Sequence, residues 1–230
     1  KGGVGKSSVT AMLAVLLSRR GLKVGVLDAD ITGPSIPRAF GIKRKARGSE
    51  MGILPEETAM GIKVMSINLL LEHEDQPVVW RGPITQFWTD VAWGELDVLL
   101  IDMPPGTGDV PLTVYQSLAV DGTIVVSTPQ SLVQMVVGKA KKMADMLSIP
   151  VLGMVENMSY AVCPDCGRRI ELFGTPEGLE QAAAEMGVPL LTRLPMNPDV
   201  ARLCDEGEIE RVVCEEMEPA ADAVERLLKE

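Results

Sequence analysis

Apolar residues recur at helical spacing near the start of the chain and then in short runs separated by polar turns. Within residues 7–20, five apolar side chains fall on one face of a helix, and Gly21 ends it: Val9, Met12, Leu13, Leu16 and Leu17. The short apolar runs predict buried strands at 24–27, 62–67, 96–101, 123–127, 151–155 and 189–194. Further helical patterns cover 112–119, 131–147, 175–186 and 219–229.

This alternation predicts an α/β fold, with a mostly parallel sheet and helices on both faces. Residues 43–60 have no clear periodicity and hold a basic cluster, so we interpret them as a surface excursion. Because no internal repeat or linker interrupts the pattern, residues 1–230 are expected to form a single domain.

The first helix is preceded by a glycine-rich stretch, Lys1-Gly2-Gly3-Val4-Gly5-Lys6-Ser7-Ser8. Such a loop turns backbone N–H groups toward one point at a helix N-terminus, which is an anion site. Lys6 would supply charge to the β- and γ-phosphates and Ser7 a hydroxyl to Mg²⁺. The pattern indicates a P-loop NTPase fold, whose first strand we expect upstream of residue 1. The alternative is a glycine-rich turn with incidental lysines.

Composition narrows the class of protein. With 46% hydrophobic residues the chain is not disordered, and no apolar run reaches the roughly 18 residues of a membrane span. From a net charge of −10 and only 3% aromatic residues, we expect the protein to bind neither nucleic acid nor an anionic membrane surface. The acidic segment 215–230 is expected to pack on its own domain. Four cysteines, two in one Cys-x-x-Cys, favour reduced thiols and a cytoplasmic location.

Aspartates follow two of the predicted strands. The strand at 24–27 leads into Asp28 and Asp30, and the run at 96–101 leads into Asp102 and a Gly/Pro loop that contains Gly106. Since carboxyl ends of parallel strands meet at the ligand-binding edge of a sheet, Asp102 is typical of a Walker B aspartate that holds Mg²⁺ through water. The alternative is an ordinary aspartate at a strand end.

Cys163 and Cys166 form a second candidate site. Two thiolates in one turn can bind one soft ion or one edge of a cluster, whereas zinc and iron–sulfur sites usually need four ligands. A symmetric dimer could supply the other two. A zinc turn, a redox dithiol and a cluster site all remain open. Cys204 and Cys214, in a stretch with a helical pattern, are interpreted as core or surface thiols.

Several segments together resemble the Mrp/ApbC family of iron–sulfur cluster carrier ATPases, within the MinD/ParA-like deviant Walker A class. They are the P-loop, 28–35, Trp80-Arg81-Gly82-Pro83, 93–97, 101–109, Thr128-Pro129-Gln130, 156–159 and 163–166. The resemblance implies a homodimer that binds ATP and Mg²⁺, hydrolyses ATP slowly, holds a [4Fe–4S] cluster between its subunits and passes it to apo iron–sulfur proteins.

The resemblance also implies roles for single residues. Nucleotide-binding roles fall on Gly2, Gly3, Val4, Gly5, Lys6, Ser7, Ser8, Asn157, Pro195 and Asn197. Lys1 would reach the phosphates of the partner subunit, Asp30 would position the attacking water, and Asn157 would read the adenine edge. Ser7, Asp28 and Asp102 would serve Mg²⁺ and its water shell. Cys163 and Cys166 would ligate the cluster.

Two other functions stay open. A MinD/ParA-like positioning ATPase would need a basic surface or a lipid-seeking helix, and neither is visible in the sequence. A zinc-stapled nucleotide switch without cluster transfer would use the same cysteine pair.

Overall fold

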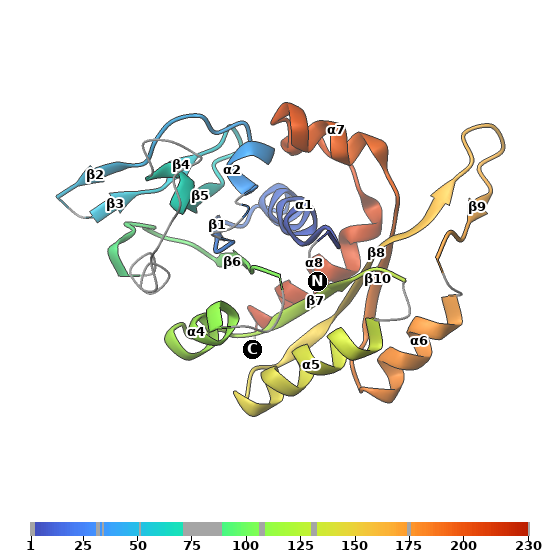
Figure 1. Cartoon of the computed structure of the whole chain (residues 1–230). Coiled ribbons are helices and arrows are strands. Elements are labelled where there is room, and N and C mark those ends of the chain that lie inside the picture. Colours follow the sequence, from blue (N-terminus) through green and yellow to red (C-terminus); the bar gives the residue numbers. More distant parts are fainter. Residues whose placement is uncertain are drawn as a thin grey trace.

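Strands and helices alternate along the chain, as the hydrophobic pattern predicts (Figure 1). The computed structural model describes residues 3–30, 33, 35–50, 52–70, 89–105, 109–129, 133–173 and 176–229. The helices are α1 (Lys6–Arg19), α2 (Ile36–Ala39), α4 (Asp109–Ser117), α5 (Val133–Met146), α6 (Pro176–Glu185), α7 (Pro198–Glu206) and α8 (Glu218–Leu227). Single 3₁₀ turns lie at Ile67–Leu69, Ile209–Arg211 and Glu215–Met217.

The first sheet has the strand order β4 (Glu56–Glu57), β5 (Lys63–Ser66), β1 (Val24–Asp28), β6 (Val98–Asp102). β1 pairs in parallel with both β5 and β6, and β4 is antiparallel to β5. All five residues of β1 are buried: Val24 and Val26 pack in the cluster that contains α1, and Leu27 packs in a second cluster with Met65. A strand covered on both faces reads as a continuous apolar run, which is why the sequence signals it clearly.

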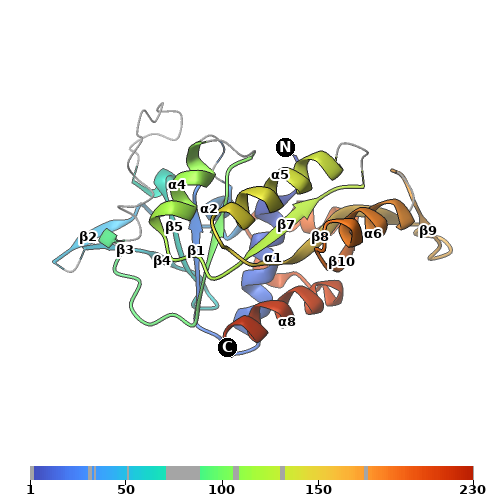
Figure 2. The same ribbon diagram turned by 90° about the horizontal axis from the view of Figure 1, so that it is seen from below.

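The second sheet has the order β10 (Leu190–Pro195), β8 (Val151–Val162), β7 (Thr123–Ser127), all parallel. Val137 of α5 and Ala183 of α6 pack against Met154 of β8. Figure 2 shows α5 and α8 on opposite sides of β7 and β8. No helix in the described ranges is long and apolar enough to cross a bilayer.

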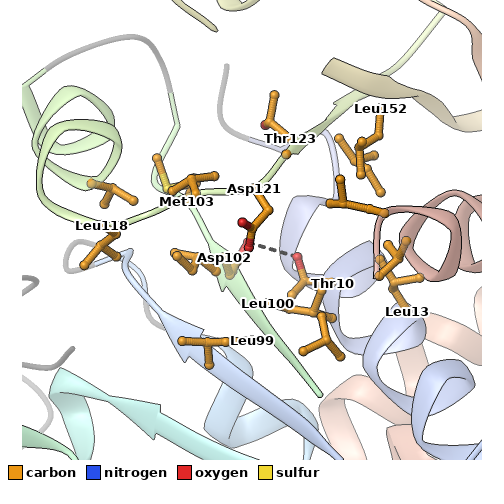
Figure 3. Close-up of a pocket in the computed structure, with 18 of the residues that line it drawn as sticks. Thr10, Leu13, Leu99, Leu100, Asp102, Met103, Leu118, Asp121, Thr123 and Leu152 are labelled. Atoms are coloured by element: carbon orange, nitrogen blue, oxygen red, sulfur yellow. Dashed lines mark hydrogen bonds between the residues drawn. The ribbon is translucent and has the colours of Figure 1, made fainter. Parts of the chain in front are cut away.

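A cavity of about 500 Å³ lies between the two sheets (Figure 3). Its walls include Leu100 of β6, Thr123 of β7 and Leu13 of α1. Within the part of the chain that the structure describes, β6 and β7 pair with each other nowhere, so each presents an edge to this cavity.

Several predicted elements are confirmed. The strand at 123–127 is β7, and the first helix begins and ends one residue earlier than predicted. The helix at 219–229 is α8, which packs on its own domain through Ala220, Ala221 and Val224, as predicted.

Two predictions are confirmed in part, and one was wrong. The strand predicted at 151–155 is longer than expected and continues to Val162. Its second half pairs with β9 (Arg169–Ile170) and β10, but its residues do not form the apolar run that would have predicted a strand. The excursion at 43–60 contains a hairpin of β2 (Arg47–Ser49) and β3 (Gly52–Leu54), followed by β4. Cys214 precedes a single 3₁₀ turn and lies in no helix, whereas Cys204 lies in α7.

Candidate functional site

The P-loop residues that the structure describes enter α1 through two glycines in the left-handed region. Gly3 has φ 81° and Gly5, the N-cap of α1, has φ 80°, conformations that favour glycine. A β-carbon on Gly5 would lie 2.2 Å from Asn157 Nδ2, so this position also needs the absence of a side chain. Lys6, Ser7 and Ser8 are half-buried at the start of the helix, where free N–H groups and the helix dipole favour an anion. Lys1 and Gly2 lie outside the described residues.

Asn157 braces the P-loop from the second sheet. Its Nδ2 donates a hydrogen bond to the Val4 carbonyl at 3.0 Å, and the side chain is buried. This contact joins β8 to the loop across 153 residues of sequence, and sequence reasoning did not foresee it. The predicted role of Asn157 at an adenine edge stays a prediction.

Asp28 and Asp102 lie side by side at the carboxyl ends of β1 and β6, where their Cα atoms are register partners. Both are buried, with 2% and 1% of their surface exposed. Asp28 accepts hydrogen bonds from the backbone N–H groups of Asp30 (3.1 Å) and Ile36 (3.2 Å). Burial, followed by the charge of Asp102, raises the pKa of Asp28 to about 7.

Asp102 shows how a cation would fit here. Burial raises its pKa to about 6, while the Ser7 hydroxyl and the Lys6 ammonium oppose that rise. Its Oδ1 accepts a hydrogen bond from the Thr10 hydroxyl at 3.5 Å (Figure 3). Its buried Oδ2 has no hydrogen-bond partner in the described part of the chain. An unsatisfied carboxylate oxygen beside a second buried carboxylate suits Mg²⁺, which prefers hard oxygen ligands.

Asp30 is half-buried on the loop that follows β1. Its Oδ1 accepts a hydrogen bond from the Gly33 N–H at 3.2 Å, and this bond shapes the loop. The role of Asp30 in positioning water stays a prediction, as does the role of Gly106, which lies outside the described residues.

The cysteine pair lies at the tip of a β-hairpin. β8 and β9 form its arms, with Ala161 opposite Ile170 and Val162 opposite Arg169. The Cys163 N–H donates to the Arg168 carbonyl and the Gly167 N–H to the Cys163 carbonyl, both at 2.9 Å, and these bonds close the turn. Figure 1 shows the hairpin projecting away from the sheets.

The turn also activates a thiol. Cys163 is half-buried and Cys166 is exposed. The backbone N–H groups of Cys166 and Asp165, and then the Cys166 thiol, stabilise the thiolate and lower the pKa of Cys163. Since the thiolate is the form that binds metals, the turn favours the metal-binding form of Cys163.

The other two cysteines lie in different surroundings. Cys204 Sγ is 4.0 Å from the Ser8 hydroxyl, and burial raises its pKa. Burial, followed by the charge of Glu216, raises the pKa of Cys214 to about 11. Among the described residues, no group of three or more His, Cys, Asp or Glu side chains is placed to hold a metal ion.

Exposed apolar side chains occur along the cysteine hairpin and next to it. They are Val162, Ile170, Leu172, Phe173 and Met196. Met196 belongs to this set because its N–H donates to the Tyr160 carbonyl of β8 at 2.7 Å. We call these five residues the hairpin rim.

Pro195 and Asn197 lie at and just beyond the end of β10. Pro195 pairs with Tyr160, and Asn197 caps α7 by accepting a hydrogen bond from the Asp199 N–H at 2.9 Å. The structure therefore gives Asn197 a local role as a helix cap, and its predicted place near a base stays a prediction.

A bulge interrupts β8 between the two candidate sites. Glu156 pairs with Arg193 and Tyr160 with Pro195, so β8 contains two more residues than β10 over this interval. Met158, inside the bulge, has φ 56°, which is rare for a residue with a side chain. Sequence reasoning missed the bulge, as well as the ion pair between Glu156 and Arg193.

A family model and several known proteins are similar to this chain. A family model described as "ParA: NUBPL iron-transfer P-loop NTPase" matches residues 1–230. An iron-sulfur cluster carrier protein from Clostridium perfringens is 47% identical over 228 residues, which cover 94% of this chain and 80% of that protein.

Two solved structures are similar as well. A nucleotide-binding protein from Archaeoglobus fulgidus, in complex with ADP and with cobalt found in it, has a TM-score of 0.86 and 49% identity, covering 95% of this chain and 87% of its own. The cell division ATPase MinD from Pyrococcus furiosus has a TM-score of 0.71 and 22% identity, covering 99% and 95%, which shows a shared fold.

Proposed function

The chain belongs to the NUBPL iron-transfer P-loop NTPase family of ParA-type proteins, and on that premise we propose that it is an ATP-dependent carrier of iron–sulfur clusters. Two copies would bind ATP, hold a [4Fe–4S] cluster as cargo between their Cys163–Cys166 turns, and deliver it to apo-proteins. The relatives named iron-sulfur cluster carrier proteins support this proposal.

One observation carries the proposal: a single strand serves both candidate sites. β8 supplies Asn157, which holds the P-loop through Val4, and it ends at Val162, directly before Cys163. A nucleotide that reorders the P-loop therefore acts on the strand that presents the thiols. A nucleotide site and a cargo site joined by one strand are what a nucleotide-controlled carrier needs.

At the nucleotide site this chain would mainly position groups and neutralise charge, as phosphoryl transfer requires. The N-terminus of α1 and Lys6 would bind the phosphates, and Asp30 would orient the attacking water. Ser7, Asp28 and Asp102 would hold Mg²⁺ directly or through water. Mg²⁺, when bound, would supply charge neutralisation at the phosphates and would compensate the buried carboxylates.

At the cysteine site the second copy would complete the ligand set. Cys163 and Cys166 offer two thiolates, and two symmetric turns offer the four that a [4Fe–4S] cluster takes. The hairpin rim supports such a pairing because exposed apolar side chains beside the turn favour contact with another surface. In the same dimer Lys1 would reach the phosphates bound by the partner subunit.

The cavity between β6 and β7 supports a further part of the proposal, concerning the domain. A strand that leads into the P-loop would pair with both free edges and join the two sheets into one. The apolar side chains of Leu13, Leu100 and Leu152 at the cavity suit the covered faces of such a strand.

Anaerobic reconstitution with iron and sulfide tests the carrier function. We expect a brown protein with about four irons per dimer that restores activity to an apo iron–sulfur enzyme, and we expect Cys163→Ser to lose both properties while Cys214→Ser keeps them. Lys6→Ala should load a cluster but lose nucleotide-dependent transfer. Tight zinc without iron uptake would instead support a zinc-stapled switch, and a strict monomer in the presence of nucleotide and cluster would refute the shared site.

A further inference from the structure

Glu156 is a buried charge that the proposed chemistry does not use. It has no exposed surface, and its Oε2 accepts hydrogen bonds from the Ser159 hydroxyl and from Arg193 Nε, both at 2.6 Å. Its Oε1 has no hydrogen-bond partner among the residues that the structure describes. Burying a carboxylate is costly, and a well-packed apolar pair would often serve stability equally well. The pair therefore calls for a reason beyond stability.

Arg193 connects this buried carboxylate to the cysteine hairpin. Arg193 lies on β10, and its Nη2 is 3.3 Å from Glu171 Oε2. Glu171 directly follows β9, so it belongs to the arm by which the hairpin returns from the cysteine turn. One guanidinium thus joins β8, β10 and the returning arm of the hairpin.

The inner end of this connection is the β8 bulge, residues 157–159. Ser159, whose hydroxyl binds Glu156, closes the bulge, and Asn157 opens it. Asn157 contacts the Val4 carbonyl, and Met158 lies close enough that its Cε would be 3.7 Å from a β-carbon on Gly5. Bulges and strained residues of this kind occur next to functional sites, where a bulge directs a side chain and a strained residue stores conformational energy.

We infer that Arg193 is a positioning residue that couples the P-loop to the cysteine turn. Its two ion pairs hold the β8 bulge and the hairpin arm as one unit, so that a shift of the P-loop, transmitted through Asn157, changes the exposure of Cys163 and Cys166. This inference rests on the proposed function, since it names the path by which nucleotide would act on the cargo site. The inner pair fixes the bulge, and the outer pair transmits its movement.

The two pairs differ in a way that makes the coupling testable. The Glu156 side chain is fully buried, so Arg193→Gln would leave an uncompensated charge and endanger folding. The Glu171 side chain is 31% exposed, and an ion pair at such a position contributes little to stability. Glu171→Gln therefore removes the charge of the outer ion pair alone and leaves only a neutral acceptor there for Arg193. Glu180→Gln is the matched control, because Glu180 is an exposed carboxylate whose charge also acts on Arg193.

The experiment measures alkylation of Cys163 and Cys166 in the cluster-free protein, by mass spectrometry, with Mg²⁺–ADP and with a Mg²⁺-bound non-hydrolysable ATP analogue. For the unmodified protein and for Glu180→Gln, we expect the alkylation rate with the ADP complex to differ from the rate with the ATP analogue by at least about fivefold, the lower end of typical coupling between sites. For Glu171→Gln we expect a ratio below about twofold, with nucleotide affinity and melting temperature unchanged. Arg193→Lys should keep more of the ratio than Arg193→Gln.

The outcomes separate this inference from the proposed function. If Glu171→Gln keeps the full nucleotide-dependent ratio, or if the unmodified protein shows none, the coupling role of Arg193 is overturned, whatever the result of cluster reconstitution. If the ratio collapses as expected while reconstitution fails, the coupling stands and the cargo is not an iron–sulfur cluster.

Discussion

Asp102→Asn is the change that tests the buried carboxylate pair most directly. The pKa of Asp102 is about 6 and that of Asp28 about 7, against an ordinary value of 3.8 for both. A carboxyl group with a raised pKa in the folded protein keeps a proton that the unfolded chain has already lost, so stability falls as pH rises from about 4 to about 7. At 1.36 kcal/mol per pKa unit, ionised Asp102 costs the folded state about 3 kcal/mol and Asp28 about 4 kcal/mol.

Part of that cost is already present at pH 5, because the unfolded carboxyls ionise near pH 4. Between pH 5 and pH 8 the metal-free protein should therefore lose roughly 3–4 kcal/mol of unfolding free energy. Asp102→Asn removes one charge and also lowers the pKa of Asp28, whose second-largest perturbation is the charge of Asp102. The variant should lose less than about 2 kcal/mol over the same range and be about 3 kcal/mol more stable than the unmodified protein at pH 8.

Urea unfolding in EDTA at a series of pH values, followed by circular dichroism, measures these differences. Adding Mg²⁺–ADP should stabilise the unmodified protein at pH 8, by about 2.7 kcal/mol at a hundredfold excess over Kd, and should stabilise Asp102→Asn much less. The exposed Asp121 provides a control, because Asp121→Asn should keep the full pH dependence. Stability that is equal at pH 5 and pH 8 in the metal-free protein would refute the reasoning, as would an unchanged slope in Asp102→Asn.

Three further predictions concern single residues. Gly5 has φ 80° and a β-carbon there would collide with Asn157, so Gly5→Ala should weaken nucleotide binding at least tenfold in a fluorescent-nucleotide titration. Gly138→Ala is the control, because its β-carbon would meet only Met186 Sδ at 3.8 Å, and it should leave the affinity unchanged. Equal affinities of the two variants would contradict the geometry. Asn157→Ala removes the hydrogen-bond donor to the Val4 carbonyl and should weaken nucleotide binding about fivefold, near 1 kcal/mol. An unchanged affinity in isothermal calorimetry would show that this hydrogen bond does not support the nucleotide site. At pH 7, Cys163 should react with iodoacetamide well before Cys214, whose pKa is about 11; the reverse order would be inconsistent with the turn geometry.

The parts of the fold that the sequence predicted well are those fixed by local pattern. The strand at 123–127 is a β-branched run that follows Gly122, and α1 combines a glycine entry with an apolar face. The P-loop and the two strand-end aspartates were found for the same reason, because their spacing along the chain sets their geometry.

The parts that were missed depend on contacts between distant segments. The second half of β8 begins with Glu156, Asn157 and Ser159, polar residues that hide a strand in any pattern of apolar positions. They are buried because partners far along the chain satisfy them: Arg193 is 37 residues from Glu156, and Val4 is 153 residues from Asn157. The motif alone located the cysteine pair, but only the pairing of β8 with β9 shows that a hairpin carries it.

The cysteine hairpin also has a consequence for engineering the protein. Residues 161–173 contain no buried side chain, so Tyr160 is the last residue of β8 in the hydrophobic core, and its ring lies 4.5 Å from the guanidinium carbon of Arg169. The turn at residues 163–168 could be exchanged for a loop with different ligand chemistry while the residues of the nucleotide site stay unchanged. The ligand chemistry of the hairpin can in this way be changed while Arg169 and Glu171, which contact Tyr160 and Arg193, are kept.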